Sequence, residues 1–265
     1  GGRAGYAGMS TSIAVVCGAA MLCAWATVRR RDRPLPSTVP VAALAAGIAG
    51  ALRHRGYVRL WLCYLSATSG VALFLALSPY VVTRVMGHGT GDAGTALLVL
   101  LAGTVLAIPA WGRALRHWDG WRLFLVAILG FAALAAAFRL VGPDARFVTT
   151  LPLYFALGVP FAGLQLVPFT LLAHLAHGAA AGGLRSEGLF TGLWTAGEKL
   201  ALAIGPAAAG LGLAAVGYDA GVQAQNSGAT GGLRVLVAVG PALLMLPAVL
   251  MIASRPLPRA VPTTS

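Results

Sequence analysis

The sequence predicts an all-α membrane protein, a bundle of transmembrane helices, and three observations support this prediction. Hydrophobic residues occupy 58% of the 265 positions, and the mean hydropathy is +0.82. Only 10% of the residues are Asp, Glu, Lys or Arg, against about 25% in an ordinary soluble domain. The apolar residues also come in long blocks, as a bilayer requires of a helix that crosses it.

Seven apolar blocks approach or exceed the ~20 residues that a helix needs to span a bilayer. The sixth block is longer than necessary, so we expect this helix to tilt or to extend beyond the membrane. The predicted spans are Met9–Val28, Leu60–Val82, Ala93–Trp111, Leu123–Val141, Leu151–Ala173, Leu189–Val216 and Leu233–Ile252.

A basic segment, 29–59, separates the first two predicted spans. Its apolar part, Val41–Leu52, is too short to cross a membrane, so we expect it to lie at the interface or to form part of a linker. Arginines near a helix end either set the orientation of the protein or bind anionic lipid, and orientation is the simpler explanation. The arginines of this segment are Arg29, Arg30, Arg31, Arg33, Arg53, Arg55 and Arg59.

The arginines are distributed unequally between alternate loops. Thirteen fall on the side that carries the 29–59 segment and the C-terminal tail, and five fall on the other side. Cytoplasmic loops carry an excess of Lys and Arg, so we expect a multi-pass protein of the cell (plasma) membrane with a cytoplasmic C-terminus. An odd number of spans then places the N-terminus outside. The chain begins with Gly1 rather than Met, which favours a fragment or a processed chain.

The net charge of +12 raises the question of a nucleic-acid partner. The arginines lie at the edges of apolar blocks and form no basic stripe with interleaved aromatic residues, so we expect no nucleic acid to bind. Enzyme motifs such as HExxH, GxSxG, the P-loop and GxGxxG are missing, which argues against an enzyme. His174 and His177 could share a helix face, but no Cys or further His lies near them in sequence. We therefore expect no metal site.

The sixth span holds the most informative residues. Lys199 lies about eleven residues into the predicted helix, near the middle of the bilayer. A charge at that depth costs at least ~2.5 kcal/mol unless it meets a partner or water. Helical spacing places Lys199 on one polar stripe with Thr191, Thr195 and Glu198. The stripe either binds substrate or couples ion movement, or Glu198 and Lys199 form a buried pair that fixes helix packing.

Three other residues are weaker candidates for a binding cavity. Gln165 lies in the middle of the fifth span, between two prolines, and Tyr80 lies near the outer end of the second. Trp194 adjoins the polar stripe, and an aromatic ring beside hydrogen-bonding groups can bind a sugar ring. Gly188 and Gly192 form a pair of small residues four apart, which would allow a close approach between helices.

A resemblance to a known family rests on the segment Gly183-x-Arg185-x-Glu187-Gly188-Leu189-Phe190, which is followed by Trp194-Thr195 and Lys199. This pattern resembles the tenth-loop and eleventh-helix region of the glycoside–pentoside–hexuronide:cation symporters. That family belongs to the major facilitator superfamily and includes melibiose permease. Supporting stretches are Arg55-Gly56-Tyr57-x-Arg59-Leu60, Pro79-Tyr80 and Trp111-Gly112-Arg113.

The resemblance implies the C-terminal half of a major facilitator fold plus the preceding helix. Residues 1–28 would be the last helix of the N-terminal half, 29–59 the central cytoplasmic loop, 60–253 the C-terminal six-helix bundle and 254–265 a cytoplasmic tail. The family's cation site, for Na+ or H+, would lie mainly in the missing N-terminal half, which would be the main protein partner. One departure is Leu172-Ala173-His174, where family members commonly carry Leu-Ala-Asp.

The resemblance favours a secondary active transporter that carries a small-molecule solute, with a sugar or glycoside as the leading substrate class. Lys199 and Glu198 would contact substrate or help to couple ion movement, and the Arg185, Glu187 and Gly188 motif would lie in a cytoplasmic loop. A seven-helix receptor or photoreceptor is the alternative, since Lys199 could hold retinal. No other span offers a carboxylate counter-ion for it. A membrane enzyme is a second alternative, against which the missing motifs argue.

Overall fold

The structure is a computed structural model that describes residues 14–15, 17–27, 48–142, 145–181, 187–219, 222 and 226–254, although not the side chains of 176–181, 187–190 and 227. The chain divides into two compact units, 1–44 and 45–265. In the first unit a short apolar helix spans Cys17–Thr27. It lies within the first predicted span, and the rest of that span falls largely outside the described residues.

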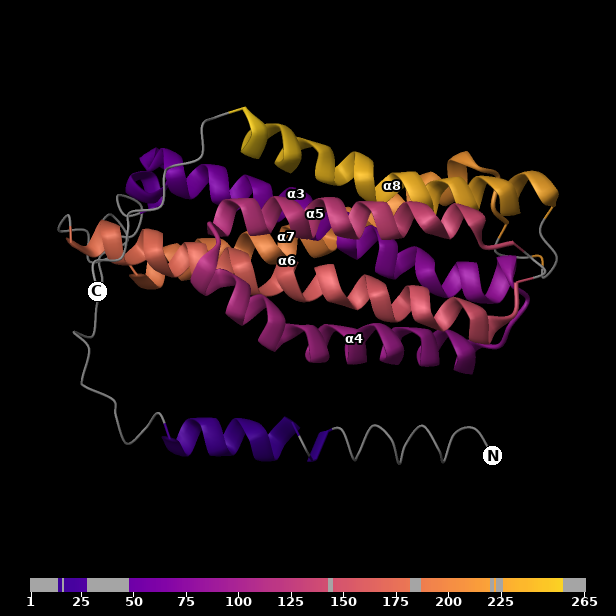
Figure 1. Cartoon of the computed structure of the whole chain (residues 1–265), viewed down its shortest axis with the longest axis horizontal. Helices are drawn as coiled ribbons and strands as arrows, with labels where there is room; N and C mark the ends of the chain where they lie inside the picture. Colours follow the sequence, from indigo (N-terminus) through magenta and orange to yellow (C-terminus); the bar gives the residue numbers. More distant parts are fainter. Residues whose placement is uncertain are drawn as a thin grey trace. The chain divides into compact units, whose positions relative to one another are not determined.

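The second unit contains six helices that are long and apolar enough to cross a membrane. Figure 1 shows them running alongside one another in a single bundle. Within the described residues this unit contains no strand, so the predicted all-α membrane bundle is confirmed. Its long helices are α3 (Arg55–Tyr80), α4 (Thr90–His117), α5 (Gly120–Ala137), α6 (Phe147–Ala181), α7 (Glu187–Ala215) and α8 (Ser227–Ala253).

Local sequence determines where several of these helices begin. Side chains of His54, Asp119 and Asn226 each accept a hydrogen bond from a backbone N–H in the first turn of α3, α5 and α8. Each of these bonds satisfies one of the donors that a helix N-terminus leaves unpaired. The cap at His54 starts α3 five residues before the predicted start of the second span at Leu60. The helix continues as a π-helical segment, Val81–Val85, beyond Pro79.

A glycine ends α7. Gly217 has a φ of +71°, which only glycine adopts without steric cost. The Gly217 N–H bonds to the Ala214 carbonyl at 3.1 Å, and the Tyr218 N–H bonds to the Leu213 carbonyl at 3.0 Å. This pair of bonds is the Schellman arrangement that satisfies the last carbonyls of a helix. It also holds the Tyr218 ring against Tyr80 at the end of α3, edge to face at 5.4 Å.

Helix α3 lies at the centre of the bundle, where it contacts α6, α7 and α8. Within its most apolar stretch 67% of the residues are buried, against 22% for α7. Phe74 of α3 packs on Phe131, Phe138 and Tyr154. The Tyr154 hydroxyl shares a hydrogen bond of 3.0 Å with Ser78. The centre of the bundle is therefore closely packed, and α7 contributes a largely uncovered face.

Glycines allow the closest helix contacts. A Cβ atom at Gly103 of α4 would meet the Phe155 carbonyl of α6, and one at Gly158 of α6 would meet the Leu100 carbonyl of α4. Gly197 of α7 lies against the Trp61 ring, and Gly205 lies against Ala72 and Leu73. Helices that lack a hydrophobic driving force in lipid associate through such small residues.

The bundle has two ends with different charge. The basic end joins the start of α3 to the end of α8, through Arg59. It carries Arg53, Arg55, Arg59, Arg113, Arg116 and Arg122 near helix ends. The opposite end carries Arg84, Arg139, Arg146 and Arg234. The structure thus brings together arginines that the loop analysis assigned to the same side.

Candidate functional site

The polar face of α7, which we define as Thr191, Thr195, Glu198 and Lys199, lies on a continuous helix. Lys199 is twelve residues after the first residue of α7 and sixteen before the last, and it lies inside the apolar span Thr191–Ala215. Thr191, Thr195 and Lys199 are exposed, and Glu198 is half-buried. The Thr195 hydroxyl donates to the Thr191 carbonyl at 3.0 Å, which satisfies one polar group within the helix.

Glu198 and Lys199 do not form the buried pair that was one explanation of the stripe. No ion pair joins these two described side chains, whereas His88 and Asp92 do form one, at 3.4 Å. Neighbouring residues on a helix point about 100° apart and do not face each other. Glu198 therefore lies towards the buried side of α7, whereas Lys199 extends from the exposed side.

An aromatic cluster borders this polar face. Trp194 is one turn before Glu198 and is buried between Tyr64 of α3 and Phe169 of α6. Its ring stacks on Tyr64 with centroids 4.3 Å apart and planes inclined by 20°, and the Phe169 centroid is 5.7 Å away. Trp61 fixes the register of α3 and α7, because its indole N–H donates to the Leu193 carbonyl at 3.0 Å.

The indole N–H of Trp194 is buried and unsatisfied among the described residues. The Tyr64 hydroxyl and the Glu198 carboxylate both lie near enough to interact with this part of the cluster. No acceptor, however, meets the Trp194 N–H with the geometry of a hydrogen bond. Most buried polar groups are hydrogen-bonded, so this donor is a notable feature beside a face of polar side chains.

Gln165 connects to this cluster through α6. It is exposed and lies one turn before Phe169, and both residues line an apolar cavity of about 370 Å³ between α4 and α6. Phe169 thus contacts Trp194 on one side and borders the Gln165 cavity on the other. Sequence reasoning did not select Phe169, and its position four residues after Gln165 is the only signal that could have indicated it.

The structure does not bring Tyr80 to this cluster. Tyr80 lies at the last residue of α3, where its ring contacts Tyr218, whereas Tyr64 and Trp194 meet some four turns earlier along α3. Arg185 lies outside the described residues. Glu187 and Gly188 begin α7, but their side-chain surroundings lie outside the described part of the chain.

Gly188 and Gly192 were expected to permit a close contact between helices. The surroundings of Gly188 lie outside the described residues, and Gly192 makes no such contact. A Cβ atom at Gly192 would meet nothing within 4 Å. Gly197 and Gly205, eight residues apart, face α3 instead. The face of α7 that carries Gly192 is the same side that carries the exposed polar residues.

The described residues hold no group of three or more His, Cys, Asp and Glu side chains close enough to share a metal ion. The polar face of α7 offers one amine, one carboxylate and two hydroxyl groups. Such groups can hydrogen-bond a polar solute, and the neighbouring rings can cover its apolar surface.

The chain is similar to known proteins over most of its length. A family model described as MFS/sugar transport protein matches residues 2–259. A curated relative from Synechocystis sp., an uncharacterized symporter, is 24% identical over 239 residues. The alignment covers 88% of this chain and 44% of the relative, so the chain spans less than half the length of that relative.

Proposed function

Because this chain belongs to the family of MFS/sugar transport proteins, we propose that it forms part of a cation-coupled symporter that carries a sugar or glycoside across the membrane. The match to an uncharacterized symporter supports symport as the mode of transport. The six long apolar helices in the described part of this chain make it a multi-pass membrane protein. The substrate class and the coupling ion are the parts of this proposal that go beyond the family.

One observation supports a solute pathway beside α7. Lys199 lies inside the apolar span Thr191–Ala215 and is exposed on the surface of the six-helix unit. A charged group in hydrocarbon is costly, and such groups face a bundle interior or a water-filled cavity. Lys199 is also too far from either end of α7 to reach the interface easily. The polar face of α7 is therefore proposed to line an aqueous cavity rather than to contact lipid.

The groups around this face suit a polyhydroxylated solute. Glu198 can accept hydrogen bonds from sugar hydroxyl groups, Lys199 can donate, and Thr195 can do either. Aromatic rings offer an apolar surface for the C–H face of a sugar, and Phe169 is the more exposed ring of the cluster.

Transport by alternating access needs a second bundle opposite this face. In such transporters the solute binds near the midplane, and two bundles rock around it. The chain covers 44% of its symporter relative, which leaves length for a second bundle in a protein of that size. We propose that this second bundle carries most of the site for Na+ or H+.

The test is solute uptake by the full-length transporter with Lys199→Ala, normalised to the amount of inserted protein. Loss of a hydrogen bond between a charged group and the substrate costs roughly 1.5–3 kcal/mol, so we expect uptake to fall at least tenfold while insertion stays normal. Glu198→Gln and the double variant are measured beside it. Normal uptake by Lys199→Ala would exclude a role in transport. Loss of inserted protein that the double variant restores would instead identify a structural pair.

We also propose that the basic end of the bundle lies in the cytoplasm, since arginines favour that side. Cysteines introduced at Arg116 and at Arg139 report on the two ends of the bundle. An impermeant thiol reagent added to intact cells should label position 139 and should label position 116 only after permeabilisation. The reverse pattern would overturn this orientation.

A further inference from the structure

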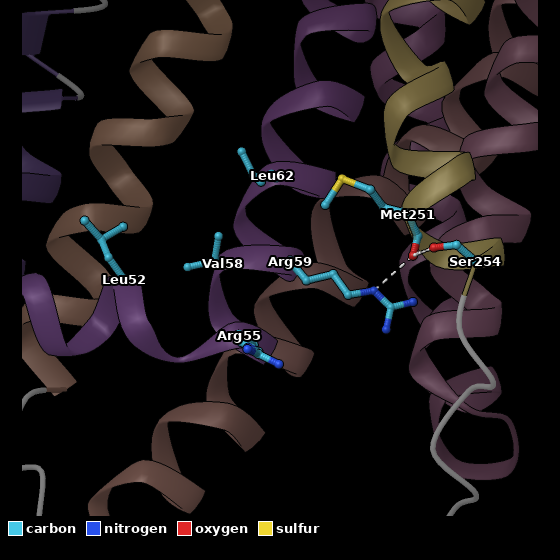
Figure 2. A pocket seen from close by; sticks show the side chains of 7 residues that line it. All are labelled: Leu52, Arg55, Val58, Arg59, Leu62, Met251 and Ser254. Carbon is cyan, nitrogen blue, oxygen red and sulfur yellow. Dashed lines mark hydrogen bonds between the residues drawn. The ribbon is translucent and has the colours of Figure 1, made fainter.

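A cavity at the basic end lies between the first turns of α3 and the last turn of α8. It has a volume of about 360 Å³, and Figure 2 shows the side chains that line it. Leu52, Val58, Leu62 and Met251 provide an apolar lining, and Arg55, Arg59 and Ser254 provide polar groups. We call this space the α3–α8 cavity.

Arg59 is held in place by α8. Its Nε donates to the Met251 carbonyl at 3.0 Å, and its Nη2 donates to the Ile252 carbonyl at 3.2 Å. Its guanidinium also lies 4.8 Å from the centroid of the Trp121 ring. These carbonyls are at the negative end of the α8 dipole, so the charge of Arg59 is partly offset but its position is fixed.

Arg55, unlike Arg59, forms no hydrogen bond with the described residues of α8. It is exposed, and no hydrogen bond or ion pair joins it to any other described residue. Figure 2 shows its side chain below Arg59, at the edge of the cavity and away from the α8 carbonyls. At this end of the bundle the carboxylate of Asp119 is described. It caps α5 by accepting a hydrogen bond from the backbone N–H of Arg122. Two guanidinium groups therefore line this cavity with no carboxylate beside them in the described lining.

The remaining lining is apolar and accessible. Leu52 is 48% exposed and Leu62 is 39% exposed, and both lie on the same side of the cavity as Val58 in Figure 2. An ordinary soluble anion would gain nothing from these side chains. A molecule with a charged head and a hydrocarbon chain would contact both parts of the lining.

The position of the cavity also matches the membrane interface. Arg55 is the first residue of its span, and Met251 is two residues before Ala253, the last residue of its span. Phosphate groups of lipids lie at this depth, just outside the hydrocarbon core. Basic pockets between transmembrane helices at this level bind lipid head groups.

We propose that the α3–α8 cavity binds an anionic phospholipid. The lipid phosphate contacts Arg55, within the positive field of the fixed Arg59, and an acyl chain runs along Val58 and Leu62. The Ser254 hydroxyl donates to the Met251 carbonyl at 3.3 Å, so it is not needed as a phosphate ligand. The bound lipid would compensate the charge that the cavity carries and would join the start of α3 to the end of α8. This inference stands on the geometry of the described residues and does not depend on which solute is transported.

The test is native mass spectrometry of the delipidated, detergent-solubilised chain titrated with dioleoyl phosphatidylglycerol or dioleoyl phosphatidylcholine. We expect phosphatidylglycerol to bind more tightly. Arg55→Gln should weaken its binding by roughly fivefold, the effect of one basic residue near a lipid head group. Arg116→Gln is the matched control, because Arg116 is exposed at the same end of the bundle but does not line the cavity. It should leave the binding unchanged.

A second variant tests the apolar part of the cavity without changing charge. Leu62→Trp fills the space that an acyl chain would occupy, so it should also weaken phosphatidylglycerol binding. If Arg55→Gln does not fold, the result for Leu62→Trp is sufficient to test the proposal. Glycerol 3-phosphate, a soluble phosphate, should not displace the lipid. Equal binding of the two lipids would overturn the proposal. So would an equal loss in Arg116→Gln and Arg55→Gln, normal binding by Leu62→Trp, or displacement by glycerol 3-phosphate at the concentration of the lipid.

Discussion

Arg59 determines how one end of the bundle is closed. Its guanidinium bonds to two carbonyls at the end of α8 and lies over Trp121 of α5, so one side chain joins three helices. The last carbonyls of α8 have no partner within the helix, and a cation is the most favourable group to place there. Cys63 of α3 lies a turn further in, with its sulfur 3.9 Å from the Ala248 carbonyl.

Arg59→Gln is therefore expected to destabilise the bundle. The glutamine cannot supply a charge and reaches at most one of the two carbonyls, so the expected loss is roughly 1–3 kcal/mol. Thermal unfolding of the purified chain in detergent measures the effect. Arg113→Gln serves as the control, because Arg113 is exposed near the same end of the bundle. Equal melting temperatures for the two variants would show that the α8 contacts contribute little.

At the scale of elements, glycines determine which helices pack backbone to backbone. The contact between Gly103 of α4 and the Phe155 carbonyl of α6 leaves no room for a methyl group. Trp111 strengthens the same pair, because its indole N–H donates to the Val159 carbonyl at 2.8 Å. The packing of α4 on α6 in turn determines the position of Gln165, which lines the cavity between these helices, and of Phe169, whose ring contacts Trp194 of α7.

Gly103→Ala should separate α4 from α6 and lower stability by about 1–3 kcal/mol, the usual cost of overpacking. Gly94→Ala is the matched control in the same helix, since a Cβ atom at Gly94 would meet nothing within 4 Å. It should be neutral or slightly stabilising, because alanine favours helix. Unfolding in detergent compares the two variants, and equal stability would contradict the close contact.

The helices could be predicted from the sequence, whereas the faces through which they pack could not. Long apolar blocks determine the spans, because any helix in lipid must satisfy its backbone internally. Helix α3 begins five residues before the predicted span Leu60–Val82, because the His54 cap depends on local hydrogen bonding rather than on hydropathy. Gly192 and Gly197 are equally plausible contact sites in a helical pattern, and only the position of Trp61 selects Gly197.

The same limit applies to the candidate site. Spacing alone predicted that Thr191, Thr195, Glu198 and Lys199 share one face of a helix, and the α7 helix agrees with this. Spacing could not predict whether that face lies inside the six-helix unit or on its surface. Exposure of Lys199 follows from the way α7 packs on α3 through Gly197, Gly205 and Trp194, which are tertiary contacts.

At the scale of the whole molecule, the account depends on what covers the polar face of α7. The six-helix unit leaves Thr195 and Lys199 exposed, at a depth where lipid would be a poor environment for them. A transporter resolves this by placing a water-filled pathway there, opposite a second bundle. By contrast, the exposed leucines of α8, such as Leu243, suit contact with lipid tails.

The most direct measurement is the reactivity of a cysteine at Thr195 in the full-length transporter, after replacement of Cys17, Cys23 and Cys63. A small impermeant thiol reagent reacts only where water reaches the sulfur. We expect Thr195→Cys to react, and transported solute to slow the reaction. Leu243→Cys, on an exposed apolar part of α8, is expected to face lipid and to stay unreactive. If Thr195→Cys is as unreactive as Leu243→Cys, the polar face of α7 does not line an aqueous pathway.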